Sequence, residues 1–458
     1  MKRLALLLAL AAVTSVFAAP EESQAQASRP NIVLILTDDQ RWDTVHGVMS
    51  VVESELIGRG IEFENAFVTD PLCCPSRASI LTGRYPHGHG VYGNNNGPDG
   101  GFEAFDDSST IATWLDDEGY RTGMIGKYLN GYEVTEGDYV PPGWDRWFAL
   151  VEPGYFDYTV SDDGALRSFS SAYSTDLLAG QATSFVYSTP PDDPLFLMFA
   201  PYAMHAPFRP ALRHEGLFAG LPDYRPPSWA EPDLSDKPRW LRQMELPSRW
   251  LLGNRDERRL RQLESLLAVD EAIARILDAL EIRGRLENTL FVYTSDNGFQ
   301  WGEHRLWGKH FPYEASTHVP LVMRYDGHMV APRPVSHMVA NIDLAPTIAA
   351  VAGITPPTQV DGLDLTALFA DPAAPVSRTG VLIEHGFTGR APPFCAYRTR
   401  RDVFIHYATG EEEYYRYRTD PYELENQAES RRVRSAVNAR RATTRSLCSP
   451  LPPGMTWR

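Results

Sequence analysis

The sequence of 458 residues has only four cysteines, no internal repeat and no zinc-type spacing of cysteine and histidine. Without that spacing, any bound metal is expected to be a hard cation rather than zinc. Beyond the N-terminus, no stretch approaches the ~18 apolar residues that a membrane-spanning helix needs. We therefore expect a mature protein without stable membrane association.

Positive charge is also scarce. The chain holds 43 Lys and Arg against 59 Asp and Glu, which gives a formal net charge of −16. General binding of nucleic acid or of an anionic membrane needs a basic face, so neither is expected. A small anionic substrate is still compatible with this charge, because a single pocket can be locally positive. Hydrophobic residues at 43% and charged residues at 22% exclude a disordered chain or a coiled coil.

The four cysteines fall into two groups. Cys395 and Cys448 lie near the C-terminus and fit one disulfide of the kind that exported proteins form. Cys73 and Cys74 fit a second disulfide badly, because neighbouring cysteines pair only through a strained ring. If both instead bridged the distant pair, no free thiol would be left.

Residues 1–19 have the pattern of a secretory signal peptide. Two basic residues precede a short apolar run and then small residues, with cleavage predicted after Ala18 or Ala19, or as late as Ala27. The alternative is a buried N-terminal helix. The signal peptide predicts export, to the periplasm or the extracellular space.

The next residues predict an α/β fold with a mostly parallel central sheet between helices. The apolar runs 31–37, 195–200 and 290–294 are typical of strands buried on both faces. Helical periodicity occupies 256–286 and 342–352. Strands that alternate with helices favour this architecture. We assign this architecture to one large domain over residues 30–375.

The pattern changes after residue 375. Short β-rich runs at 381–384, 403–407 and 414–418 precede a polar helical segment at 423–445. These predict a small antiparallel sheet with one helix, so we assign residues 376–458 to a C-terminal α+β subdomain. Residues 207–253 are rich in Pro, Trp and Arg without periodicity, which predicts a long surface loop.

Two of the buried strands end in oxygen-bearing side chains. Asp38 and Asp39 follow the first strand, and Asp296 and Asn297 follow the third. Sites of open α/β sheets lie beyond the carboxyl ends of strands, and hard cations prefer carboxylate and amide oxygens. Each pair alone could equally form an ordinary turn. Together they predict one metal site.

The segment from Cys73 to Arg84 reads CCPSRASILTGR. Pro75 and the residues after it predict a helix that begins near Cys73, where backbone N–H groups favour an anion. Arg77 lies one helical turn later on the same face. A nucleophile and a fixed positive charge therefore converge where anions bind.

This segment matches C-x-P-S-R-x-x-x-L-T-G-R at every fixed position, so the chain resembles the type I sulfatases of the alkaline phosphatase superfamily from Asn31 to about Asn426. The resemblance implies that a separate formylglycine-generating enzyme oxidises Cys73 to formylglycine, whose hydrate is the nucleophile. It also implies one Ca²⁺ per chain, with ligands at Asp38, Asp39, Cys73, Asp296 and Asn297.

The resemblance assigns further site residues. Arg77 holds the formylglycine, Lys127 and Lys309 bind the sulfate, and His205 lies at the ester oxygen. Many sulfatases carry a histidine two residues after the first lysine, but this chain has Leu129 there, followed by Asn130. A weaker expectation places further side chains at the substrate end of the site: His87, His89, Asn94 to Asn96 and His304.

The sequence therefore predicts hydrolysis of sulfate monoesters to an alcohol and inorganic sulfate. The segment 126–132 and the Cys-Cys form of the signature are similar to N-acetylglucosamine-6-sulfatases, so a sulfated sugar such as N-acetylglucosamine-6-sulfate is the expected substrate. The alternatives are an arylsulfatase of broad specificity, a phosphomonoester or phosphodiester hydrolase of the same superfamily, and a glycan-binding pseudoenzyme.

Overall fold

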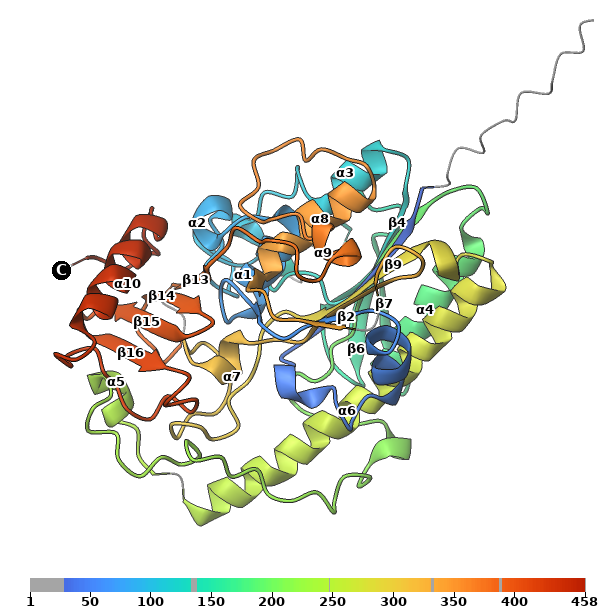
Figure 1. Cartoon of the computed structure of the whole chain (residues 1–458). Helices are drawn as coiled ribbons and strands as arrows, with labels where there is room; N and C mark the ends of the chain where they lie inside the picture. Colours follow the sequence, from blue (N-terminus) through green and yellow to red (C-terminus); the bar gives the residue numbers. More distant parts are fainter. Residues whose placement is uncertain (1–28, 133–137, 247, 331–332, 387–388, 458) are drawn as a thin grey trace, which may run out of the picture.

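The computed structural model describes residues 29–132, 138–246, 248–330, 333–386 and 389–457. The expected signal peptide at residues 1–19 lies outside these ranges. A large sheet and a small sheet lie beside each other in Figure 1, the small one formed by the C-terminal part of the chain. None of the described helices combines the length and the apolar character needed to cross a bilayer.

The large sheet has ten strands, and its central strands β9, β1, β8, β4 and β5 run parallel. Antiparallel pairs lie toward both edges, which confirms the predicted mostly parallel sheet. In spatial order the strands are β11 (Arg333–Val335), β2 (Ile61–Phe63), β10 (Leu321–Tyr325), β9 (Thr289–Ser295), β1 (Asn31–Thr37), β8 (Leu195–Ala200), β4 (Arg121–Gly126), β5 (Arg146–Glu152), β6 (Tyr158–Asp162) and β7 (Ala165–Phe169).

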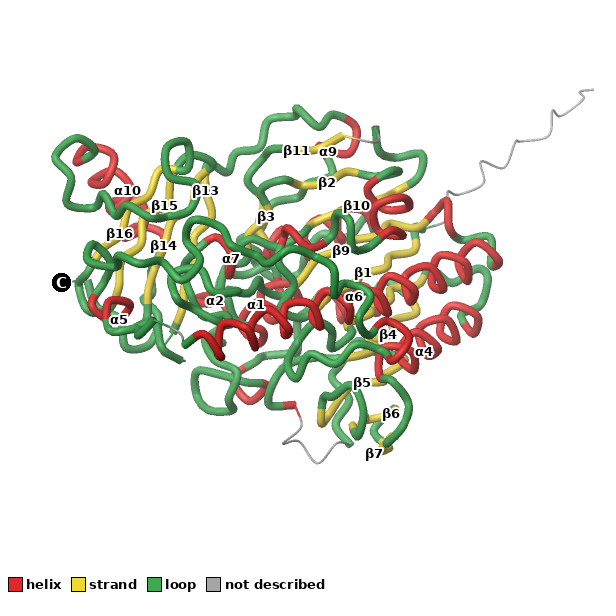
Figure 2. The backbone as a smooth tube through the Cα atoms, turned by 90° about the horizontal axis from the view of Figure 1, so that it is seen from below, coloured by secondary structure: helices red, strands yellow, loops and turns green. Residues whose placement is uncertain are grey.

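Strand β1 is apolar along its length because it contributes to two cores. Leu34 and Leu36 lie in one hydrophobic cluster and Val33 and Ile35 in the other. Successive side chains of a strand point to opposite faces, so a central strand needs apolar partners on both. The first face is covered by α1 (Cys73–Thr82), α3 (Ile111–Asp117) and α8 (Leu344–Val351). The second face is covered by α4 (Ser174–Ser188) and α6 (Arg249–Ile282), which lie together in Figure 2.

The small sheet is antiparallel throughout, in the order β13 (Gly380–His385), β14 (Phe394–Thr399), β15 (Asp402–Tyr407) and β16 (Glu412–Arg416). Helix α10 (Arg434–Leu447) packs on it through Val433 and Val437. A disulfide joins Cys395 of β14 to Cys448 at the end of α10, which confirms the predicted pairing. Cys73 and Cys74 are free thiols.

The remaining elements are short. They are the two-stranded pair β3 (Ala66–Phe67) and β12 (Val339–Ala340), and the helices α2 (Pro86–His89), α5 (Arg239–Arg242), α7 (Glu314–Thr317) and α9 (Ala367–Ala370).

Helix α10 begins eleven residues later than the predicted segment 423–445. The intervening chain is held in a non-helical form, because the Lys237 ammonium donates to the backbone oxygens of Glu423 and Leu424 at 2.9 and 2.6 Å. Glu423 has a φ of 57°, which an α-helix does not allow. A contact with a residue almost 190 positions away therefore overrides the local helical pattern.

Two other predicted helices are correct in kind and differ in extent. Helix α6 begins at Arg249 rather than 256, so the loop predicted at 207–253 ends where this helix begins. It stops at Ile282 rather than 286, because Gly284 adopts a left-handed φ of 65°. Helix α8 begins at Leu344, since residues Asn341–Asp343 form a 3-10 turn.

Candidate active site

The parallel pairing of β1 with β9 brings the two acidic strand ends together. Thr37 lies opposite Ser295, so Asp38, Asp39, Asp296 and Asn297 follow at the same edge of the sheet. The backbone N–H of Asp39 donates to Asp296 Oδ1 at 3.1 Å, and Asn297 Nδ2 donates to Asp39 Oδ1 at 2.8 Å. All four side chains are buried.

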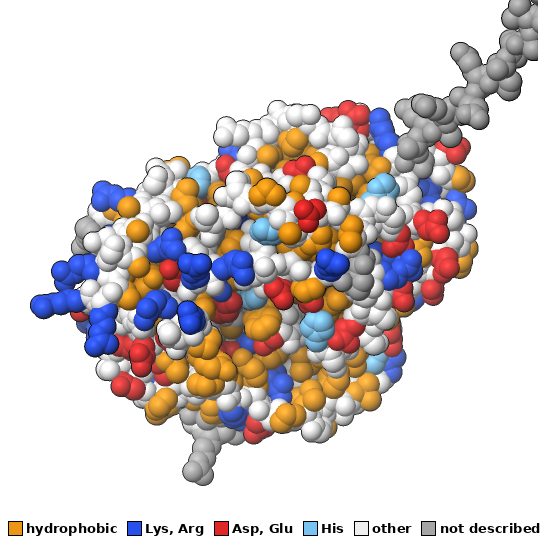
Figure 3. Space-filling model, in the orientation of Figure 1, with side chains coloured by type: hydrophobic (Ala, Val, Ile, Leu, Met, Phe, Trp, Pro, Cys, Tyr) orange, Lys and Arg blue, Asp and Glu red, His pale blue; other side chains and the backbone are white. Residues whose placement is uncertain are grey.

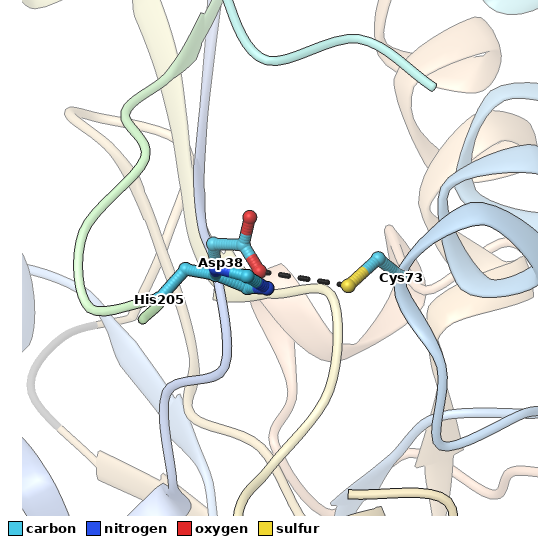
Figure 4. Close-up of side chains that lie close together, drawn as sticks. All are labelled: Asp38, Cys73 and His205. Carbon is cyan, nitrogen blue, oxygen red and sulfur yellow. Dashed lines mark hydrogen bonds between the residues drawn. The ribbon is translucent and has the colours of Figure 1, made fainter. Parts of the chain in front are cut away.

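Helix α1 places Cys73 beside these carboxylates. Cys73 is its first residue, as predicted, and is completely buried. Its Sγ lies 3.6 Å from Asp38 Oδ1 and 2.9 Å from Lys309 Nζ. In Figure 4 Cys73 points at Asp38 from the helix side, while His205 reaches Asp38 from a different loop. The residues that the sequence grouped by motif therefore share one site.

Arg77, one turn after Cys73, holds the buried side of the site in place. Its Nε donates to Asp296 Oδ2 at 2.7 Å and its Nη1 donates to the backbone oxygen of Lys127 at 2.6 Å. Its Nη2 lies 3.7 Å from Asp38 Oδ2. Because the guanidinium is fully buried, it fixes the positions of two carboxylates and of the chain that carries Lys127.

Two lysines complete the charge balance. Lys127 follows β4, and its Nζ lies 2.5 Å from Asp38 Oδ2; Lys309 Nζ lies 2.5 Å from Asp39 Oδ1. Only four of the 43 basic residues in the sequence are lysines, and two of them lie here. A compact ammonium offers three donors from one point, which suits a tetrahedral anion.

His205 marks the open side of the site. Its Nε2 lies 3.9 Å from Asp39 Oδ2, and its side chain is 26% exposed, whereas that of Asp38 is fully buried. Its Nδ1 lies 2.9 Å from the Ala206 backbone oxygen, which fixes the ring and directs Nε2 inward. Burial and the Lys309 ammonium lower the pKa of His205.

Burial and nearby charges shift the pKa values of the site residues in different directions. Burial opposes ionisation of Asp38, but Lys127, together with the other nearby cationic side chains, brings its pKa below the ordinary value. Burial and the neighbouring Asp38 raise the pKa of Asp296. Burial raises the pKa of the Cys73 thiol to about 12 despite the two lysines. An unmodified Cys73 is therefore a neutral thiol and a weak nucleophile at neutral pH.

The strand-end residues also form a group that could hold a metal ion. Asp38, Asp39, Cys73 and Asp296 each place one ligand atom within 4.8 Å of the others. Asn297 Oδ1 is buried and has no hydrogen-bond partner among the described residues. A buried, unpaired oxygen beside three carboxylates fits a hard divalent cation.

The structure adds one pair that the sequence did not indicate. Asp70, three residues before Cys73, lies 2.9 Å from Nδ1 of His385, and both are completely buried. No local signal could reveal this pair, since 315 positions separate the two residues. His304 is 1% exposed, and its Nδ1 lies 2.6 Å from a carboxylate oxygen of Glu231. Leu129 packs into the core.

His87, His89 and Asn94 each have a hydrogen-bond partner within the protein. His87 lies against the Glu384 carboxylate, 2.8 Å away, and His89 Nε2 lies 3.0 Å from Ser79 Oγ. Asn94 lies close to the signature segment, because its Oδ1 accepts from the backbone N–H of Cys74 at 2.9 Å.

Fold and site together define an α/β protein with a buried, metal-compatible cluster at the carboxyl ends of parallel strands. The family model described as Sulfatase matches residues 30–354, and the one described as N-sulphoglucosamine sulphohydrolase, C-terminal, matches residues 302–446. The chain belongs to the sulfatase family.

Individual relatives agree with this family. The chain is 37% identical to human N-acetylglucosamine-6-sulfatase over 79% of its length and 68% of the human protein. It is 36% identical to a Caenorhabditis elegans protein named as an extracellular sulfatase Sulf-1 homologue, over 75% of this chain and 49% of that protein. The chain thus spans about half the length of this longer relative.

A solved structure shares the fold. It was determined in complex with its substrate D-glucosamine-2-N,6-O-disulfate, and it superposes with a TM-score of 0.81. The match covers 92% of this chain and 97% of that one at 24% sequence identity.

Proposed function

We propose that this protein is a sulfatase that hydrolyses sulfate monoesters of sugars, with Cys73 matured to formylglycine. The observation that carries the proposal is the position of Cys73 at the start of α1, with Asp38 and Lys309 both in contact with its side chain. Family membership and the raised pKa of the thiol support the need for an oxidised side chain at this position.

Two groups would complete the site. A hydrated formylglycine at position 73 would supply an oxygen nucleophile and a second hydroxyl. Asp38, Asp39, Asp296, Asn297 and residue 73 would hold a calcium ion, which would supply positive charge to the site.

The chain's own residues then bind and orient the ester. Lys127 and Lys309 donate to sulfate oxygens, in the way that fixed cations stabilise phosphoryl groups during transfer. Arg77 holds Asp296 and the Lys127 backbone in place. His205 lies on the open side of the site, from which its Nε2 would donate a proton to the departing alcohol oxygen. Lys309 is the alternative proton donor to that oxygen.

Removal of divalent cations is expected to lower both activity and stability. Excess EGTA would remove a cation that the folded protein binds through Asp38, Asp39 and Asp296 and the unfolded chain does not. The folded state would then lose the free energy of binding, and the nucleophile would lose its positioning. Thermal unfolding should occur at a lower temperature and sulfate release should stop. Added Ca²⁺ should restore both, whereas unchanged activity after complete chelation would contradict the calcium site.

The substrate proposal is tested with matched esters. We expect the matured protein to release sulfate from N-acetylglucosamine-6-sulfate with a kcat/KM at least about tenfold above that for galactose-6-sulfate or an aryl sulfate, since one lost polar contact in a buried site has this effect. Inorganic sulfate is measured by ion chromatography. A protein shown by mass spectrometry to carry formylglycine, yet inactive on every ester, would contradict the proposal.

We also propose that the protein acts after export, in the periplasm or outside the cell. The signal pattern at residues 1–19 and the extracellular naming of the nematode relative support this location. We further propose that the chain divides into a catalytic part over 30–375 and a C-terminal part over 376–458. The two separate sheets support this division.

A further inference from the structure

The C-terminal part of the chain differs from the rest in charge. Residues 376–458 contain 14 Arg against 9 Asp and Glu, whereas the whole chain contains 43 basic and 59 acidic residues. The formal net charge is therefore +5 for this part and −21 for the rest of the chain. In Figure 3, Lys and Arg side chains gather on the left of the molecule, where Figure 1 places the small sheet and α10. The acidic protein thus has one basic region.

A hollow of about 680 Å³ lies in this region, between the chain that enters β13, the turn from β14 to β15, and α10. We call it the basic pocket. Four of the side chains that line it are arginines: Arg378, Arg400, Arg401 and Arg440. No acidic side chain of the described residues lines it. Several like charges around one hollow create a local positive potential that attracts anions.

Buried carboxylates hold two of these arginines in place. Arg378 donates to both carboxylate oxygens of Asp343, to Oδ1 at 2.7 Å, and Asp343 is completely buried. Arg440 donates from Nε to Asp402 Oδ1 at 2.7 Å and from Nη2 to Oδ2 at 3.3 Å. The Arg440 side chain is 28% exposed, and its Nη1 has no partner among the described residues. This donor is therefore fixed in direction and open to a ligand.

The other two arginines are exposed to solvent. Arg400 and Arg401 connect β14 to β15, and neither forms an ion pair with a carboxylate in the described ranges. Asp402 follows them directly, but its oxygens already accept from Arg440 and from the hydroxyls of Thr399 and Tyr414. The charges of Arg400 and Arg401 are therefore accessible and not neutralised within the protein.

Strand β13 connects the basic pocket with the catalytic site. Its first residue, Gly380, follows Thr379 of the pocket wall, and its last residue, His385, contacts Asp70, three residues before Cys73. At about 3.3 Å per residue, the strand spans roughly 17 Å. A single sugar unit is too short to occupy both places, and only a chain of several units is long enough.

We propose that the basic pocket binds sulfate and carboxylate groups of a polyanionic glycan, on units of the chain remote from the ester that is hydrolysed. This inference rests on the proposed function and deepens it, because it names a sulfated polysaccharide as the substrate class. Guanidinium groups bind both kinds of anion through paired hydrogen bonds. A ligand that occupies two linked sites binds more tightly than one that occupies either alone. The acidic remainder of the protein repels polyanions and directs them to this region.

The test measures affinity for heparin, a sulfated polysaccharide with uronate carboxylates, in a Cys73→Ala background at about 0.15 M NaCl. The double variant Arg400→Gln with Arg401→Gln should have a Kd for heparin about tenfold higher, because charge-assisted contacts are lost. The affinity should also depend less steeply on salt concentration, since fewer counter-ions are released on binding. An unchanged Kd would overturn the inference.

Arg431→Gln with Arg432→Gln is the matched control. These two arginines are also adjacent, exposed and in the C-terminal part, but they do not line the pocket. The control loses the same charge and should keep most of the affinity for heparin. An equal loss in both double variants would show an effect of net charge alone and would overturn the pocket.

Duplex DNA is the comparison polyanion. We expect it to bind more weakly than heparin and to respond less to the Arg400 and Arg401 substitutions. If DNA bound as tightly as heparin and lost as much affinity in the variant, the pocket would be a general polyanion site and the glycan assignment would be wrong.

Turnover by the matured protein separates this inference from the proposed function. The kcat/KM ratio of a long 6-sulfated oligosaccharide to N-acetylglucosamine-6-sulfate should fall in the Arg400 and Arg401 double variant. Loss of heparin affinity without hydrolysis of any ester would support the pocket and contradict the sulfatase proposal. Hydrolysis with an unchanged ratio and an unchanged Kd would do the reverse. Both arginines are exposed, so the urea midpoint of unfolding should stay the same, which verifies that the variant folds.

Discussion

Cys73→Ala is expected to abolish sulfate release, lowering kcat by about 10⁴-fold or more, while the protein remains folded. The substitution removes the side chain that, once oxidised, supplies the attacking oxygen. The surrounding lysines and carboxylates remain and can still position the ester. Without the nucleophile, however, the ester is attacked only slowly, by water. Release of sulfate from a 6-sulfated sugar and the urea unfolding curve are measured on the same preparation.

Cys74→Ala provides the control for this experiment. Cys74 is equally buried and is also a free thiol, but its Sγ faces the backbone oxygen of Asn130 at 3.7 Å rather than the acidic cluster. We expect this variant to be matured and active. If Cys73→Ala retained the activity of Cys74→Ala, residue 73 would not be the nucleophile.

Arg77→Met is expected to destabilise the protein by about 3–5 kcal/mol, which is the usual effect of removing one partner of a buried ion pair. Arg77 is completely buried, and its loss leaves Asp296 with neither its 2.7 Å donor nor water. The free energy of unfolding is measured with urea in excess EGTA, so that no divalent cation replaces the lost charge.

The double variant Arg77→Met with Asp296→Asn tests the reason for this loss. With the uncompensated carboxylate also removed, the double variant should be more stable than Arg77→Met alone, even though it contains more substitutions. A single variant within about 1 kcal/mol of wild type would show that Arg77 is not the electrostatic anchor of the site.

The buried strands were predictable because their pattern is local. The runs at 31–37 and 195–200 coincide with β1 and β8, since a strand buried on both faces has to be apolar at every position. Strand β14 was not predicted, although it lies at the centre of the small sheet. Its residues Phe394–Thr399 alternate less clearly and are defined by pairing with β13 and β15. The predicted start of α10 was wrong for a similar reason, because a contact with Lys237 holds the preceding chain in a non-helical form.

The candidate site also has a part that was predictable from the sequence and a part that was not. The signature at Cys73 and Arg77 and the acidic strand ends are short motifs, whose spacing alone placed them near a helix start and at strand ends. The Asp70–His385 pair carries no local signal, because the contact exists only once distant segments have packed together.

By itself, then, the sequence determined the α/β class, the positions of three buried strands along the chain and the chemical types present at the catalytic edge, because periodicity and motif spacing are properties of neighbouring residues. Only the tertiary structure decided how closely Lys127 and Lys309 approach the carboxylates and which histidines have hydrogen-bond partners elsewhere. Such distances depend on how strands and helices far apart in the chain come into contact, and electrostatic energies follow those distances.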